Sequence, residues 1–153
     1  MLVAFCVRSW SLNTEKKKMF AIKISKKRWD RIVGNSKRSF SKRVRGVYCP
    51  ITTPLNEREE IDEKRLSNNV KYLLGTQVEG IVALGSTGEF ASLSFEEKKR
   101  AYSVVSQSWK EEGKKEKTLI ADVGSNCAKE VGTLTEEASS LGFRYAMVLT
   151  PHY

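Results

Sequence analysis

Residues 81–90 read IVALGSTGEF, an apolar run that changes abruptly into Gly-Ser-Thr-Gly-Glu. A continuous apolar run predicts a buried strand, and the glycines predict a tight turn where that strand ends. The turn is not a P-loop, because no lysine follows its second glycine, and it does not read GxGxxG. Two hydroxyls, those of Ser86 and Thr87, therefore follow a buried strand, between glycines that allow a ligand to approach the backbone.

The segments on both sides of this stretch alternate between strands and helices. Apolar runs at 46–52, 80–84, 118–123 and 145–150 predict strands, and segments at 61–75, 94–112 and 127–141 predict helices. Ser94 and Glu97 have the spacing of a capping box, and Gly75 and Gly142 follow the last turns of their helices. Continuous apolar strands are typical of parallel sheets. The order predicts an α/β fold, either a doubly wound open sheet or part of a (β/α)8 barrel.

Charge divides the chain near Arg45. Residues 1–45 hold 14 Lys/Arg against two acids, whereas residues 46–153 hold 13 against 16, within a formal net charge of +9. We therefore expect a basic, poorly ordered extension over residues 1–45 and a domain over residues 46–153. An organellar transit peptide is the first alternative for the extension, and contact with nucleic-acid phosphates is a weaker one.

Composition excludes several classes of protein. Hydrophobic residues make up 40% and charged residues 29%, as in soluble domains, and no apolar run approaches the ~18 residues of a membrane span. Cys6, Cys49 and Cys127 are far apart and form no CxxC pair, which argues against zinc or a disulfide framework. We expect a cytoplasmic protein without metal or cofactor, or a mitochondrial or plastid protein if residues 1–45 are a transit peptide. The single histidine, His152, excludes a mechanism that needs two histidines in one chain.

Four motifs follow one another along residues 46–153. They are GVYCPITTPL (46–55), GSTGEFASLSFEEK (85–98), ADVGSNCAKE (121–130) and VLTPHY (148–153). Together they resemble the dihydrodipicolinate synthase / N-acetylneuraminate lyase family of Schiff-base aldolases. The first is similar to a strand that ends in TPF, and the second to a G-[ST]-[TN]-G-E turn with its helix. The third is similar to a strand with a G-x-N turn, and the last to a strand that ends in PYY.

The resemblance implies the N-terminal half of a (β/α)8 barrel and a lyase that forms a Schiff base with pyruvate or a related 2-oxo acid. It implies that Thr87 binds the substrate carboxylate through its hydroxyl and backbone N–H, with Gly85 as a further substrate-binding residue. Ser86 matches the hydroxyl of a proton relay. Tyr153 matches the relay tyrosine that reaches the active site of a neighbouring subunit, so we expect a homo-oligomer for the completed protein.

The chain also departs from the family pattern. Leu55 replaces the usual Phe after TP, His152 replaces the first Tyr of PYY, and Asp122 stands where the family has a small residue. A barrel of this class takes roughly 250 residues, so we expect this chain to be a fragment that lacks the Schiff-base strand. The lysines at 71, 98, 99 and 129 all fall on predicted helices. We expect the chain to be inactive alone; the alternative is a truncated, non-catalytic relative that associates with other subunits.

A partial barrel has unusual surfaces. Its first and fourth strands are expected to be open edges, which promote aggregation unless they are covered. Its inner face is expected to be exposed, with the residues Val47, Ile81, Ala83, Ile120 and Met147.

Overall fold

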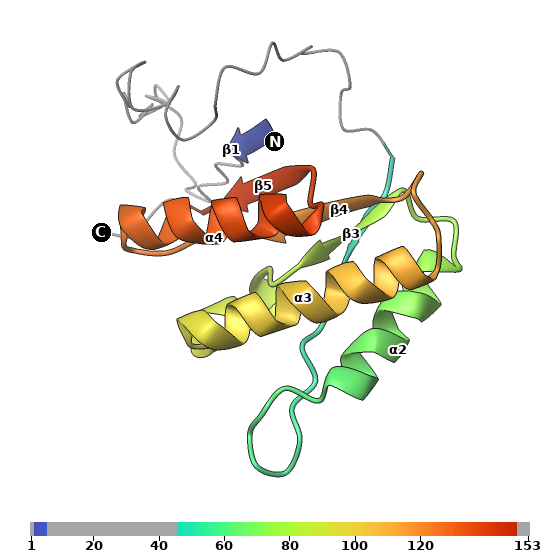
Figure 1. Ribbon diagram of the computed structural model, residues 1–153, viewed down its shortest axis with the longest axis horizontal. Coiled ribbons are helices and arrows are strands. Elements are labelled where there is room, and N and C mark those ends of the chain that lie inside the picture. The colour runs from blue at the N-terminus through green and yellow to red at the C-terminus, as the bar shows by residue number, and fades with distance from the viewer. Residues whose placement is uncertain (1, 6–45, 150–153) are drawn as a thin grey trace, which may run out of the picture.

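The computed structural model describes residues 2–5 and 46–149 of the 153-residue chain (Figure 1). The strands are β1 (Leu2–Phe5), β2 (Tyr48–Pro50), β3 (Gly80–Ala83), β4 (Thr118–Asp122) and β5 (Tyr145–Val148). The α-helices are α2 (Glu63–Leu74), α3 (Phe95–Glu111) and α4 (Ala128–Leu141). The predicted alternation of strands and helices after residue 45 is confirmed, with each element a little shorter than predicted.

The strands form one parallel sheet in the order β1-β5-β4-β3-β2. From β2 to β5, neighbours in the sheet are also consecutive in the sequence, so the strand order never reverses. Figure 1 shows α2, α3 and α4 side by side along one face of this sheet. A doubly wound sheet reverses its strand order and carries helices on both faces, whereas a barrel does neither. Of the two predicted architectures, the structure therefore has that of consecutive barrel strands.

The hydrophobic core lies between the helices and one face of the sheet. Ile81 is paired with Leu119, and Ala83 with Ala121, and each of the four is at most 1% exposed. The prediction that Ile81 and Ala83 belong to the exposed inner face is wrong, because strand residues alternate between faces and these two face the helices. The inner face instead carries the half-buried side chains of Val82, Ile120, Tyr145 and Met147.

The two edges of the sheet differ. β2 is three residues long and ends in Pro50, which has no backbone N–H, so this edge is short and poorly suited to further pairing. At the other edge β1 pairs in parallel with β5, from Leu2 opposite Tyr145 to Phe5 opposite Val148. The prediction that the fourth strand of the domain is an open edge is therefore wrong. The predictions for residues 6–45 lie outside the described residues.

The helix ends follow the chemistry predicted from the sequence. Ser94 Oγ accepts the backbone N–H of Glu97 at 3.3 Å, and Glu97 Oε2 accepts the backbone N–H of Ser94 at 2.7 Å. Asp62 caps α2 by accepting the N–H of Arg65 at 2.9 Å. Gly142 ends α4 with φ 101°, a left-handed conformation that favours glycine. The predicted capping box and the predicted glycine stop are confirmed.

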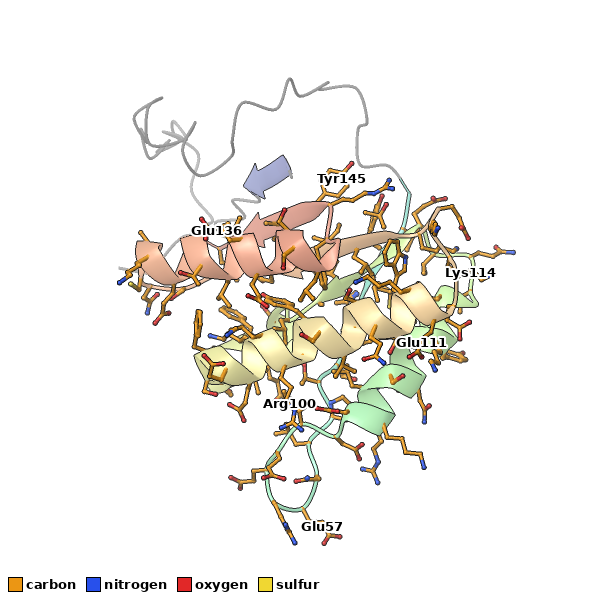
Figure 2. All side chains as sticks on the ribbon, viewed as in Figure 1. Glu57, Arg100, Glu111, Lys114, Glu136 and Tyr145 are labelled. Atoms are coloured by element: carbon orange, nitrogen blue, oxygen red, sulfur yellow. The ribbon has the colours of Figure 1, made fainter. Side chains whose placement is uncertain are left out.

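The helices carry charged groups on their outward side. Arg100 of α3 forms an ion pair with Glu63 of α2, and Lys71 of α2 forms one with Glu111 of α3 at 2.9 Å. Figure 2 labels Arg100 and Glu111 on α3. Because all four side chains are substantially exposed, these pairs contribute little to stability. Among residues 2–5 and 46–149, no helix is both long enough and apolar enough to cross a membrane.

Replacing Ser94 by Ala is expected to lower the free energy of unfolding by about 1 kcal/mol, because the first turn of α3 loses its capping acceptor. The measurement is urea unfolding followed by circular dichroism. Ser92→Ala is the matched control, since Ser92 is exposed and precedes the helix. Equal unfolding midpoints for the two variants would contradict the role of Ser94 as the cap.

Candidate functional site

The candidate site lies at the carboxyl ends of β3, β4 and β5, where ligands bind in parallel α/β folds. After β3 the chain forms two short 3-10 turns, Ser86–Gly88 and Phe90–Ser92, before Ser94 starts α3. Leu84 and Glu89 flank the first turn, with φ angles of 56° and 55°. Residues other than glycine rarely adopt this left-handed conformation, and such strained positions are concentrated at functional sites.

The two glycines of the turn have different roles. A Cβ on Gly88 would lie 3.0 Å from the carbonyl oxygen of Ile51, and Thr53 Oγ1 donates to the carbonyl of Gly88 at 2.8 Å. Gly88 is therefore the point where the turn packs against the segment that follows β2. A Cβ on Gly85 would meet only ordinary contacts at 3.8 Å, one of them with the methyl group of Met147 on the inner face. Gly85 therefore leaves room at the inner face instead of allowing a close backbone contact.

Ser86 and Thr87 are exposed, and neither hydroxyl has a hydrogen-bond partner within the described part of the chain. The first N–H groups of a helical turn also have no acceptor inside that turn. The carbonyl groups, in contrast, are used: Gly85 and Ser86 accept from the N–H groups of Gly88 at 2.8 Å and Glu89 at 3.1 Å. The turn therefore presents hydrogen-bond donors to solvent, which is the requirement for binding a carboxylate or phosphate.

Asp122, the last residue of β4, adds a buried carboxyl group at the same carboxyl ends of the strands. The residue is 2% exposed, and its Oδ1 accepts the N–H of Gly124 at 2.9 Å. Its Oδ2 is buried without a hydrogen-bond partner among the described residues. Burial raises the pKa of Asp122 to about 6, although the Gly124 N–H and the positive charge of Lys98 act in the opposite direction. One carboxyl oxygen of Asp122 thus has unused capacity for a hydrogen bond.

Tyr102 of α3 holds the end of β4 in place. Its hydroxyl donates to the backbone carbonyl of Asp122, and its ring packs edge-on against Phe143, with ring centroids 5.4 Å apart. Burial raises the pKa of Tyr102 far above its usual value, so the hydroxyl stays protonated and keeps donating. Sequence analysis missed this contact, because the position of Tyr102 on a helix predicts burial but does not say which carbonyl the hydroxyl reaches.

The structure describes part of the predicted site. Gly85, Ser86 and Thr87 come together in one turn at the end of β3, as predicted. Tyr153 and His152 lie outside the described residues, so the predicted relay role of Tyr153 stays a prediction.

The described strands carry no lysine, and the described residues form no group of side chains suited to hold a metal ion. The four lysines considered from the sequence lie on helices, as predicted: Lys71 on α2, Lys98 and Lys99 on α3, and Lys129 on α4. Within residues 46–149, no lysine lies on a strand. In the same range, no group of three or more His, Cys, Asp or Glu side chains is placed to hold a metal ion.

Comparison with known proteins assigns the family. The model of the dihydrodipicolinate synthetase family matches residues 43–153. The chain belongs to this family. The 4-hydroxy-tetrahydrodipicolinate synthase of Methanothermobacter thermautotrophicus is 32% identical over 111 residues, which cover 72% of this chain and 38% of that protein. The N-acetylneuraminate lyase of Fusobacterium nucleatum is 34% identical over 111 residues, which cover 72% of this chain and 37% of that protein.

Solved structures of the dihydrodipicolinate synthetase family give the same result for the fold. The dihydrodipicolinate synthase from Aquifex aeolicus matches with a TM-score of 0.66 and 27% identity, over 72% of this chain and 36% of that chain. The chain thus spans little more than a third of the length of these relatives. Strands β2 to β5 and helices α2 to α4 are the N-terminal half of the family's (β/α)8 barrel, so the predicted fold class is confirmed. Strand β1 lies outside the matched range.

Gly88→Ala is expected to lower the free energy of unfolding by about 1–3 kcal/mol, because its Cβ would lie against the backbone of Ile51. Gly85→Ala is the matched variant. Its φ of −72° suits alanine and its Cβ would have room, so stability is expected to stay unchanged or rise slightly. Thermal unfolding of both variants is the measurement. Similar losses of stability in the two would contradict the separate roles of the two glycines.

Asp122 predicts a specific dependence of stability on pH. Its pKa in the folded protein is about 6, above the value of about 3.9 expected for an unfolded chain, so the folded state binds the proton more tightly. The stabilising contribution is therefore complete below about pH 4 and is lost as pH rises through about 6. The loss is roughly 3 kcal/mol at most, since one pKa unit corresponds to about 1.4 kcal/mol.

Asp122→Asn removes this titration and tests it. The unfolding free energy of the variant relative to that of the unmodified chain should rise between about pH 4 and about pH 7. Urea unfolding at both pH values gives the two differences. Glu116→Gln, at an exposed position, controls for general effects of losing one acid. A difference that does not change with pH would show that the pKa of Asp122 is not raised.

Proposed function

We propose that this chain is the substrate-binding half of a Schiff-base aldolase or lyase that acts on pyruvate or a related 2-oxo acid. The observation that carries the proposal is the exposed pair of hydroxyls, Ser86 and Thr87, at the carboxyl end of β3. Thr87 binds the substrate carboxylate through its hydroxyl and its backbone N–H, and Gly85 leaves room beside them. Ser86 and Tyr153 belong to a proton relay, in which Tyr153 reaches the site of a neighbouring subunit.

The geometry of the turn supports carboxylate binding. The hydroxyls of Ser86 and Thr87 have no hydrogen-bond partner among the described residues. Leu84 and Glu89, on the two sides of the turn, adopt the strained left-handed conformation. Because Gly88 bonds to Gly85 within the turn and accepts from Thr53 of the segment after β2, the turn is fixed and its donors are oriented before a ligand arrives. Donors that are already oriented lose less conformational freedom on binding, which favours affinity for a small anion.

The nucleophile of the reaction is assigned to another part of the barrel. In Schiff-base aldolases a lysine amine adds to the 2-oxo carbonyl and water leaves, and the resulting iminium withdraws electrons from the neighbouring carbon. No lysine on a described strand can play this part, since those of residues 46–149 lie on helices or loops. We therefore propose that the chain alone binds a 2-oxo acid without catalysing a reaction.

A second candidate function rests on the same lack of a strand lysine. It is a non-catalytic relative whose inner face packs against other subunits. The half-buried inner-face residues Val82, Ile120 and Met147 favour it, because a sheet face with this composition is usually covered in a finished protein. The two candidates differ in whether the chain binds the 2-oxo acid.

Titration with pyruvate, followed by the backbone amide signals in NMR, tests the proposal. The amide signal of Thr87 is expected to shift with pyruvate, and Thr87→Val should weaken the affinity about tenfold or more, because a hydrogen bond to a charged group is lost. Thr133→Val is the matched control, since Thr133 is exposed on α4 and bonds only to its own helix. An unmodified chain whose amide signals do not respond to pyruvate would overturn the proposal and favour the non-catalytic relative.

Treatment with pyruvate and borohydride tests the absence of the nucleophile separately. We expect no stable adduct on the chain in a mass spectrum, whereas a full-length family enzyme treated in parallel should gain one. An adduct on a lysine of this chain would show that the proposal has misplaced the nucleophile.

A further inference from the structure

Strand β1 is the one described element that the family match does not include. The match begins at residue 43, yet Leu2–Phe5 joins the sheet as an edge strand beside β5. The pairing is parallel and in register over the whole strand: Leu2 with Tyr145, Val3 with Ala146, Ala4 with Met147 and Phe5 with Val148. Figure 1 shows β1 directly beside β5, on the side away from β4.

The position of β1 has a meaning in a (β/α)8 barrel. Barrel strands pair in parallel with the next strand along the chain. β5 is the fourth strand of the matched domain, and β4 already occupies one of its edges. The remaining edge of β5 is therefore the place of a fifth barrel strand. β1 occupies this place and runs in the direction that a fifth strand would take.

The sequence of β1 suits a strand that covers an edge. Its residues, Leu-Val-Ala-Phe, are all apolar, and the first charged side chain of the extension is that of Arg8. An uncovered edge at β5 presents unpaired backbone groups next to the apolar residues Ala146 and Val148, a combination that promotes pairing between chains. The opposite edge at β2 has a proline and needs no such cover.

We propose that the free edge of β5 is a docking site for a parallel apolar strand, and that residues 2–5 occupy it as a built-in edge strand. The occupant and a fifth barrel strand use the same backbone groups of β5, so they exclude one another. The chain can then accept the rest of a barrel, from any source, only after β1 leaves.

The small size of β1 makes such an exchange feasible. Four residues are at the short end of the range for strands, so β1 contributes few hydrogen bonds. Its attachment to the same chain raises its effective concentration at the edge, which allows a weakly bound strand to stay in place. A longer strand on a packed half barrel has more bonds and more buried surface with which to displace it.

Disulfide formation between paired positions tests where β1 lies. In a chain with Cys6, Cys49 and Cys127 changed to Ser, Ala4→Cys with Met147→Cys joins neighbouring strands about 4.8 Å apart, within reach of a disulfide. Ala4→Cys with Val82→Cys is the matched control, because β3 lies three strand spacings away, about 14 Å. We expect an intramolecular disulfide in most chains of the first variant and in few of the second. Equal yields would overturn the proposal.

A peptide of residues 1–8, with Cys6→Ser and a fluorescent label, tests whether the edge is a docking site. In the full-length chain, Val3→Pro with Ala4→Pro removes the N–H groups that β1 needs for pairing. This variant is expected to bind the peptide at least tenfold more tightly than the unmodified chain, whose edge is occupied. Val3→Ile with Ala4→Val keeps an apolar strand and should behave like the unmodified chain. A peptide with the same residues in scrambled order should bind neither the unmodified chain nor either of the two double variants.

Circular dichroism separates opening of the edge from unfolding. If the proline variant keeps its helices and still binds the peptide no better than the unmodified chain, the docking site does not exist and the proposal fails. If that variant unfolds, the peptide is titrated against the Ala4→Cys/Met147→Cys chain in its reduced and oxidised forms. Binding to the reduced form that the disulfide abolishes supports the proposal, and equal binding to both forms refutes it. Both tests are independent of pyruvate binding, so they can fail while the proposed function stands, or hold while it fails.

Discussion

Backbone pairing along a parallel sheet is the constraint on which the rest of this structure depends. The pairs β2–β3, β3–β4 and β4–β5 each join strands that are separated by one helix in the sequence, so the helices must first bring these strands together. Ile81, Leu119 and Ala146 are completely or almost completely buried beneath those helices, which fixes the register of the sheet. A sheet of this kind has two edges wherever the barrel is not closed. At one edge Pro50 of β2 lacks the N–H that further pairing needs, and at the other edge β1 covers β5.

The same pairing creates the candidate site. The N–H of Ile51 donates to the carbonyl of Val82 at 3.0 Å, and Thr53 then reaches the carbonyl of Gly88. These bonds connect the segment after β2 to the turn after β3, so the left-handed conformation of Leu84 is maintained by packing that lies outside the turn itself. Strain of this kind costs on the order of 1–3 kcal/mol and persists only where the surroundings determine the backbone fully. The exposed donors of the turn are thus a product of the fold and not of the local sequence alone.

Local sequence determined much of this fold in advance. The Ser94–Glu97 box, the glycine after α4 and the alternation of strands and helices were predictable, because each depends on residues a few positions apart. Which face of the sheet each strand residue lies on was not predictable. A continuous apolar run such as that of β3 does not alternate with a period of two, so it does not show which side Ile81 faces. The pairing of β1 with β5 and the bond from Tyr102 to Asp122 were also missed, because both join segments whose proximity only the finished fold creates.

Asp122 connects the stability of this half barrel to the completion of its site. A buried carboxyl with one unpartnered oxygen among the described residues is a cost that the folded state bears at neutral pH. Any group that donates a hydrogen bond to Oδ2, from a ligand or from another part of a barrel, removes some of that cost and therefore binds the folded state in preference to the unfolded one. Binding of this kind stabilises the fold by mass action. The buried carboxyl group of Asp122 thus lowers the stability of the domain while its Oδ2 has no donor, and it couples folding to the binding of any group that supplies one.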